Sequence, residues 1–157
     1  MSQLLVIAEE GEREMAEKLF PDTPVLVTGI GAINIINALK EIPRDTPLIN
    51  VGYAGSANYN IGTWVRVTKA FLHHPNITYP EPELKLNLSP STFHLSPLID
   101  APCYTSVDFV LASPYKDCVF DMEIAFILAM GFTNVQSYKY VSDNLSYHEY
   151  KNTTAGN

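Results

Sequence analysis

Short apolar segments alternate with segments of helical periodicity along the first half of the chain, and this order restricts the possible folds more than any other feature. Each apolar segment is too short for a buried helix, so we interpret it as a strand. The helical segments end before Pro21 and Pro43, because proline cannot continue a helix. The predicted strands span residues 3–8, 25–28, 48–51 and 64–72, and the predicted helices span residues 9–20 and 32–42.

Strands that are separated by helices pair in parallel, and the helices then cover both faces of the sheet. The sequence therefore predicts a three-layer α/β/α fold of the α/β class, with a largely parallel, mixed central sheet. Residues 75–102 interrupt the alternation and hold six of the chain's 11 prolines. Because core-forming patterns resume directly after them, we interpret these residues as a surface excursion from one domain that spans residues 1–157.

The charge balance and the lengths of the apolar segments exclude several classes of function. The net charge is −7 with only three arginines, whereas a nucleic-acid surface needs clustered lysine and arginine. No apolar run reaches the ~20 residues of a membrane span, and no basic region precedes the first apolar segment. Cys103 and Cys118 lack metal-ligand spacing and indicate two buried thiols in a reducing cytoplasm. We expect no nucleic-acid and no membrane partner.

Two acidic motifs lie at the edges of apolar stretches in the C-terminal part of the chain. Asp121 and Glu123 precede the apolar residues 124–130, and Asp143 follows the apolar residues 135–141. Burying an unpaired carboxylate is costly, and burial raises the pKa of a carboxyl group. A carboxyl group with a raised pKa can serve as a proton donor in catalysis. These motifs are therefore the best candidates for a functional site.

Each of these polar motifs also has a purely structural interpretation. Asp143 could cap a helix that begins near Leu145, and Glu123 could be an ordinary first-turn acid that the helix dipole favours. His73 and His74 are adjacent on a predicted strand, where neighbouring side chains point to opposite faces. We therefore expect no metal site at this histidine pair.

Small residues follow two of the predicted strands. Gly29-Ile30-Gly31 joins a strand to a helix, but Asn34 stands at the third glycine position of a dinucleotide fingerprint. Asn50 closes the next strand, where that fingerprint requires an acidic residue. We therefore expect no dinucleotide cofactor. Residues 50–56 form a second small-residue turn, at which a ligand can approach the backbone closely.

Taken in order, five motifs of the chain resemble those of the nucleoside phosphorylase superfamily. They are Gly29-Ile30-Gly31, Gly52-Tyr53-Ala54-Gly55, Ile61-Gly62, Asp121-Met122-Glu123 and Ser142-Asp143. Within the superfamily, the chain looks most like the 5′-methylthioadenosine/S-adenosylhomocysteine nucleosidases, over residues 4 to about 150. The resemblance implies a phosphorylase/hydrolase-like fold and hydrolysis of the N-glycosidic bond of a purine nucleoside. It also implies a cytoplasmic homodimer without a cofactor, acting in purine nucleoside metabolism and methionine salvage.

The same resemblance implies a role for each matching residue. Asp143 would protonate the purine at N7 so that the base can leave, and Glu123 would hold the ribose hydroxyls. Glu12 would activate the attacking water, with Glu9 and Glu10 as alternatives near the same place. The remaining predicted substrate contacts are Met122 against the sugar, Phe109 against the base, and Tyr53, Ala54, Gly55 and Ser142 in the small-residue segments.

The chain also departs from the family pattern, which leaves other functions open. It is short for the superfamily, the hairpin after the first helix is absent, and only a short segment follows Asp143, where relatives have a long helix. Counterparts of the phosphate-binding arginines are lacking, which favours hydrolysis over phosphorolysis. The alternatives are a phosphate-dependent nucleoside phosphorylase, a non-catalytic nucleoside-binding homologue and a generic α/β ligand-binding domain. We expect a dimer interface that includes part of the excursion.

Overall fold

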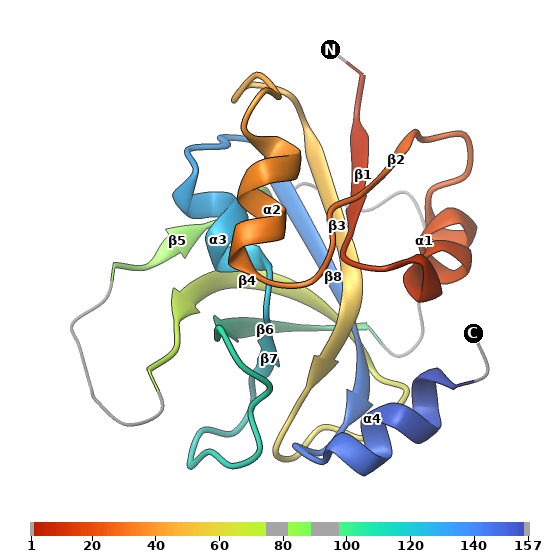
Figure 1. Ribbon diagram of the computed structural model, residues 1–157. Coiled ribbons are helices and arrows are strands. Elements are labelled where there is room, and N and C mark those ends of the chain that lie inside the picture. Colours follow the sequence, from red (N-terminus) through yellow and green to blue (C-terminus); the bar gives the residue numbers. More distant parts are fainter. Residues whose placement is uncertain (1, 75–81, 89–97, 156–157) are drawn as a thin grey trace.

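The computed structural model describes residues 2–74, 82–88 and 98–155 and places eight strands in one sheet (Figure 1). Most strand pairs are parallel, while β3 with β7, β4 with β5 and β4 with β8 are antiparallel. The largely parallel, mixed sheet that the sequence predicts is therefore present. The strands are β1 (Leu4–Ile7), β2 (Val25–Val27), β3 (Leu48–Gly55), β4 (Trp64–Leu72), β5 (Leu84–Lys85), β6 (Leu98–Thr105), β7 (Val119–Asp121) and β8 (Val135–Asp143).

The sheet closes on itself, which differs from the open central layer that the sequence predicts. β3 pairs with β8, β8 with β4, β4 with β6, β6 with β7, and β7 again with β3. These five strands form a barrel-like circuit, which β1 and β2 extend beside β3. Irregular register in the β3–β8 and β4–β6 pairs accounts for the closure, because bulges bend strands and increase their twist.

Helices cover both faces of the sheet around β1, as a layered fold requires. Val6 packs in a core cluster with Ile35 of α2, whereas its neighbours Leu5 and Ile7 pack with Ala16 of α1 on the other face. None of the described helices is long and apolar enough to cross a membrane. The helices are the 3-10 helix η1 (Glu10–Glu12), α1 (Arg13–Leu19), α2 (Ala32–Leu39), α3 (Ile124–Ala129) and α4 (Tyr147–Thr154).

The third strand continues through the segment that the sequence predicts to be a turn. β3 runs to Gly55, and all of its residues are buried. A Cβ atom at Gly52 would lie 2.7 Å from Oε2 of Glu12, and one at Gly55 would lie 2.8 Å from Oδ2 of Asp143. Glycine within a strand marks a close approach of another group. The two glycines thus admit carboxylates beside a strand and form no turn.

Two strands overlap the predicted surface excursion. β5 lies inside it, and β6 begins at Leu98, before its expected end. The pairing of β4 with β6 changes register between Val67 and Ala70, where Pro102 has no N–H to donate to the ladder. Proline therefore marks an irregularity within a strand here, and it does not mark the end of a loop.

Three strand ends meet on one side of the barrel. Gly55 at the end of β3 pairs with Phe120 of β7 and with Asp143 at the end of β8. α3 begins shortly after β7, and α4 follows β8 and packs against it (Figure 1). This topology brings segments that are far apart in the sequence, including both acidic motifs, to one place.

Candidate active site

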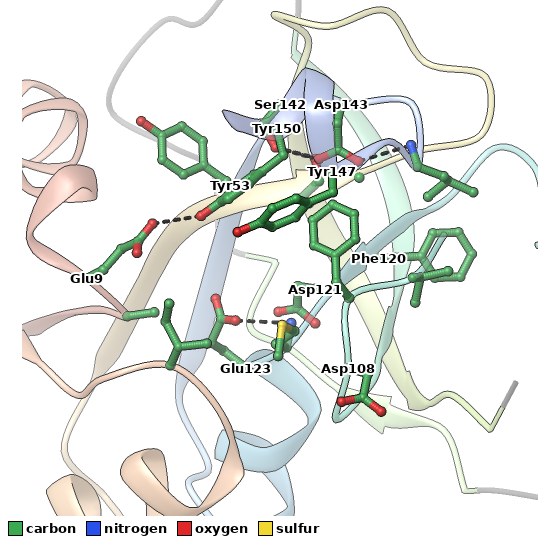
Figure 2. A pocket seen from close by; sticks show the side chains of 18 of the residues that line it. Glu9, Tyr53, Asp108, Phe120, Asp121, Glu123, Ser142, Asp143, Tyr147 and Tyr150 are labelled. Carbon is green, nitrogen blue, oxygen red and sulfur yellow. Dashed lines mark hydrogen bonds between the residues drawn. The ribbon is translucent and has the colours of Figure 1, made fainter. Parts of the chain in front are cut away.

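A cavity of about 370 Å³ opens where the ends of β3, β7 and β8 meet (Figure 2). Cavities of this size accommodate small organic ligands. The structure brings together all of the residues that the sequence predicts for the site, because each of them lines this cavity. They are Glu12, Tyr53, Ala54, Gly55, Phe109, Met122, Glu123, Ser142 and Asp143.

Glu12 reaches the cavity from η1, just after β1. Its Oε1 accepts hydrogen bonds from the backbone N–H groups of Ala8 (2.9 Å) and Glu9 (3.2 Å). Its Oε2 accepts one from the N–H of Tyr53 (2.9 Å) and lies against the side-chain-free surface of Gly52. Backbone donors thus fix this buried carboxyl group in one orientation.

The three neighbouring glutamates have different surroundings. Glu10 is exposed and pairs with Arg13, whose Nε lies 2.7 Å from its Oε2. Glu9 and Glu12 both line the cavity, but Glu9 is partly exposed to solvent, whereas Glu12 is buried. Of the three alternatives, Glu10 is therefore the one that does not line the cavity.

Lys139 projects from β8 toward the carboxyl groups of Asp121 and Glu123 and is fully buried. Its Nζ lies 2.9 Å from Oδ2 of Asp121 and 3.4 Å from Oε1 of Glu123. Lys139 pairs in register with Gly52, where the missing side chain leaves space for the ammonium group. Lys139 is not among the residues predicted from the sequence, although it is the only charged residue in the apolar stretch 135–141.

The single ammonium group does not compensate all three carboxyl groups equally. Burial raises the pKa of Glu12, and it raises the pKa of Glu123 to about 8. Burial would also raise the pKa of Asp121, but the attraction of Lys139 and hydrogen bonds to both carboxylate oxygens lower it. Asp121 is therefore the permanent counter-ion of Lys139, and the raised pKa of Glu123 favours its protonated form.

Asp143 closes β8 at the other end of the cavity and is buried (Figure 2). Its Oδ1 accepts a hydrogen bond from the Ser142 hydroxyl (2.8 Å), and its Oδ2 accepts one from the N–H of Leu145 (3.0 Å). Burial raises the pKa of Asp143 despite these bonds. The interpretation of Asp143 as a helix cap is wrong, because Ser146 caps α4 by accepting the N–H of Glu149 (3.2 Å).

Glu123 also differs from an ordinary first-turn acid. Oδ2 of Asp121 accepts the N–H of Ile124 (2.8 Å), the first residue of α3, whereas the side chain of Glu123 makes no capping bond. Oε2 of Glu123 instead accepts the N–H of Met122 (3.0 Å). The capping role in this motif belongs to Asp121, which leaves Glu123 in the cavity wall.

Aromatic side chains from α4 and from the segment before β7 complete the cavity. The ring centroid of Phe109 lies 5.5 Å from that of Tyr147 and 5.6 Å from that of Tyr150. Tyr150 also contacts Tyr53 of β3 edge-on, at a centroid distance of 6.2 Å. Neither tyrosine of α4 is predicted from the sequence. The helix has no buried apolar stripe, and so its pattern does not indicate that it packs at the site.

The histidine pair lies outside this cavity. His73 packs edge-on against Tyr104, Tyr115 and Phe120, with centroid distances of 5.3–6.1 Å, and burial lowers its pKa. Among residues 2–74, 82–88 and 98–155, no group of three or more side chains has the composition and proximity to hold a metal ion. The surroundings of His73 indicate aromatic packing of a neutral imidazole.

The protonation of Glu123 predicts a specific dependence of stability on pH. Because the pKa of Glu123 rises from 4.5 to about 8 in the folded state, the native protein retains a proton that the unfolded chain releases in that interval. The free energy of unfolding therefore falls from about pH 5 to pH 8, by at most about 1.4 kcal/mol per pH unit for this group. We expect Glu123→Gln to flatten this decline in urea unfolding curves. The exposed Glu14→Gln should keep the parent slope, and equal slopes in all three proteins would contradict a protonated Glu123.

Comparisons with known proteins place this site in a known fold. No protein-family profile and no curated protein matches the chain. Solved structures do match: MTAN from Chlamydia trachomatis bound to MTA has 21% identity and a TM-score of 0.73, with 99% of this chain and 90% of that chain covered. The MTA/SAH nucleosidase of Streptococcus pneumoniae in complex with 8-aminoadenine has 16% identity and a TM-score of 0.75 (99% and 91% covered). The Neisseria meningitidis 5′-methylthioadenosine/S-adenosylhomocysteine nucleosidase in complex with methylthio-immucillin-A has 17% identity and a TM-score of 0.73 (99% and 94% covered). The chain therefore shares the fold of these nucleosidases, which agrees with the resemblance seen in its sequence.

Proposed function

We propose that this protein hydrolyses the N-glycosidic bond of a purine nucleoside. One observation carries the proposal: a single cavity has the buried acid Asp143 at one end and the buried Glu123 at the other (Figure 2), and the buried Glu12 lies beside Glu123 around Gly52. The fold is shared with solved nucleosidases whose structures contain MTA or purine-like inhibitors, which supports the same assignment. The setting that we propose is purine nucleoside metabolism, including methionine salvage, in the cytoplasm.

At the base end, Asp143 would act as the general acid. Its raised pKa favours the protonated form, and proton transfer to N7 allows the purine to leave without a full negative charge. Ser142 orients the carboxyl group by donating a hydrogen bond to Oδ1. Phe109, in the aromatic wall, would contact the plane of the base.

At the sugar end, the acidic cluster would stabilise the positive charge that develops on the ribose. Glu12 is the proposed base for the attacking water, because its oxygens are fixed by backbone donors at the cavity wall. Glu123 would bind the ribose hydroxyls, and Met122 would pack against the sugar. Lys139 would act indirectly, by holding Glu123 in place through the contact between its Nζ and Oε1.

The positions of the arginines favour water over phosphate as the nucleophile. Arg13 pairs with Glu10, Arg44 donates to backbone carbonyls near the end of α2, and Arg66 pairs with Asp100. These are all three arginines of the sequence, and none of them lines the cavity. Phosphate transfer sites use bidentate guanidinium contacts, which this chain does not supply from its own residues.

A panel of purine nucleosides tests the reaction directly. We expect release of the free base and free sugar at the same rate with and without added phosphate, as followed by chromatography of both products. Sugar 1-phosphate as product, with turnover that requires phosphate, would identify a phosphorylase instead. Binding of nucleosides without any base release would identify a non-catalytic homologue.

Replacement of Asp143 tests the general acid. We expect Asp143→Asn to lower kcat by about 10²–10⁴, because removal of a general acid typically costs this much, while the nucleoside still binds. Calorimetric binding and thermal unfolding should stay close to those of the parent protein. Ser146→Ala, which removes the actual cap of α4, is the matched control and should lower stability by about 1 kcal/mol without a comparable loss of kcat. Near-normal turnover of Asp143→Asn would overturn the mechanism.

We also propose that the chain forms a homodimer. Exposed apolar side chains lie just before α2 and on α2 itself, and others lie on the segment that contains Phe109; Ile30 among them also lines the cavity. Exposed apolar patches mark protein interfaces, and Ile33 and Ile36 are neighbours one turn apart on α2. The exposed residues are Ile30, Ile33, Ile36, Val107 and Leu111. The excursion is a further contributor, although its residues 75–81 and 89–97 lie outside the described part of the chain.

Light scattering over a dilution series tests the dimer. We expect twice the monomer mass at micromolar concentration and a shift toward monomer in Ile33→Asp, whose side chain is 73% exposed. Ile61→Asp, at an exposed position outside the two segments, is the control and should leave the mass unchanged. A monomer over the whole series would rule out the dimer.

A further inference from the structure

Glu9 and Tyr150 meet at the cavity wall, and the proposed reaction uses neither of them (Figure 2). Oε1 of Glu9 accepts a hydrogen bond of 2.9 Å from the hydroxyl of Tyr150. Glu9 precedes η1, whereas Tyr150 belongs to α4, so the bond joins opposite ends of the chain. Both side chains are only partly buried, which leaves them within reach of a ligand.

The pair lies beside the sugar end of the cavity. The N–H of Glu9 donates to Glu12, and the ring of Tyr150 packs against Tyr53, whose N–H also donates to Glu12. In addition to burial and the bond to Glu9, repulsion from the charges of Glu12 and Glu123 raises the pKa of Tyr150. The Tyr150 hydroxyl is therefore close enough to both carboxyl groups to interact with them electrostatically.

We propose, on the basis of the nucleosidase function above, that Glu9 and Tyr150 form a polar subsite for the substituent at the sugar end of the nucleoside. The geometry suits a substituent that donates hydrogen bonds, with a primary ammonium group preferred over an apolar thioether, so the methylthio nucleoside of methionine salvage would be a weaker-binding substrate. The carboxylate of Glu9 can accept further hydrogen bonds besides that from Tyr150, and the Tyr150 hydroxyl can itself accept one.

The surrounding charge supports a cationic substituent. Glu9, Asp108 and Asp121 line the cavity besides Asp143, Glu12 and Glu123, which the proposed reaction uses, whereas Lys151 is the only basic residue among the lining side chains of the described chain. An apolar group placed against Glu9 would remove water from a carboxylate without replacing its hydrogen bonds, which is costly. An ammonium group would replace them with charge-assisted bonds.

Three adenine nucleosides that differ only at the 5′ position test the subsite: 5′-amino-5′-deoxyadenosine, adenosine and 5′-methylthioadenosine. Their dissociation constants are measured by calorimetry on Asp143→Asn, in which the base is not released. We expect the amino compound to bind at least tenfold more tightly than the methylthio compound. Adding Glu9→Met should abolish or reverse this ratio, and adding Glu9→Gln should reduce it for the amino compound in particular. Tyr150→Phe should weaken binding of adenosine and of the amino compound, but not binding of the methylthio compound.

Glu14→Met is the control, because it replaces an exposed glutamate of α1 and should leave the binding ratio unchanged. Tighter binding of the methylthio compound, or a ratio that Glu9→Met does not change, would overturn the polar subsite even if the protein hydrolyses nucleosides. Conversely, the expected binding ratio without any turnover in the parent protein would support the subsite and overturn only the hydrolytic function.

Discussion

The contact between Lys139 and Asp121 organises the acidic half of the cavity. Both side chains are fully buried, and their charged atoms are 2.9 Å apart. Removing one partner of a buried ion pair typically costs about 3–5 kcal/mol, because the other charge is left without compensation. Asp121 also accepts hydrogen bonds from Thr105 and from the first N–H of α3. One ion pair therefore fixes β8, β7 and the start of α3 relative to one another, and with them the position of Glu123.

The close placement of the carboxyl groups depends equally on two positions of β3 that have no side chain. Gly52 and Gly55 lie three residues apart on the same buried strand, and each leaves space for a carboxylate of another element. A side chain at either position would require the carboxylate to move, and well-packed interiors tolerate such insertions poorly. The spacing of these glycines thus sets the separation between the two ends of the cavity. The same residues resemble a ligand-binding turn in the sequence because close approach of any group favours glycine.

Much of the fold could be predicted from the sequence, and the exceptions have physical causes. The pattern of residues 64–72 gives β4 with its correct bounds, because apolar and polar residues alternate there. β6 escaped prediction because Pro102 usually ends a strand, and only the pairing with β4 reveals that it interrupts one. The motif order selected residues that line one cavity, whereas Lys139, Tyr147 and Tyr150 gave no such signal. Their importance arises from contacts between β8, α4 and distant elements, and such contacts leave no periodic signal in the sequence.

The two ends of the cavity owe their different chemistry to their surroundings. Burial raises the pKa of Asp143 and Glu12 alike, and hydrogen bonds oppose this rise at both, from Ser142 and Leu145 at Asp143 and from Ala8 and Tyr53 at Glu12. The difference is the buried ammonium group of Lys139, whose attraction lowers the pKa of Glu12. Environments that treat similar carboxyl groups differently are the general means by which one site provides both an acid and a base. In the hydrolysis that we propose, an acid at one end of the cavity and a carboxylate at the other would serve both proton transfers, since the leaving base must gain a proton while water loses one.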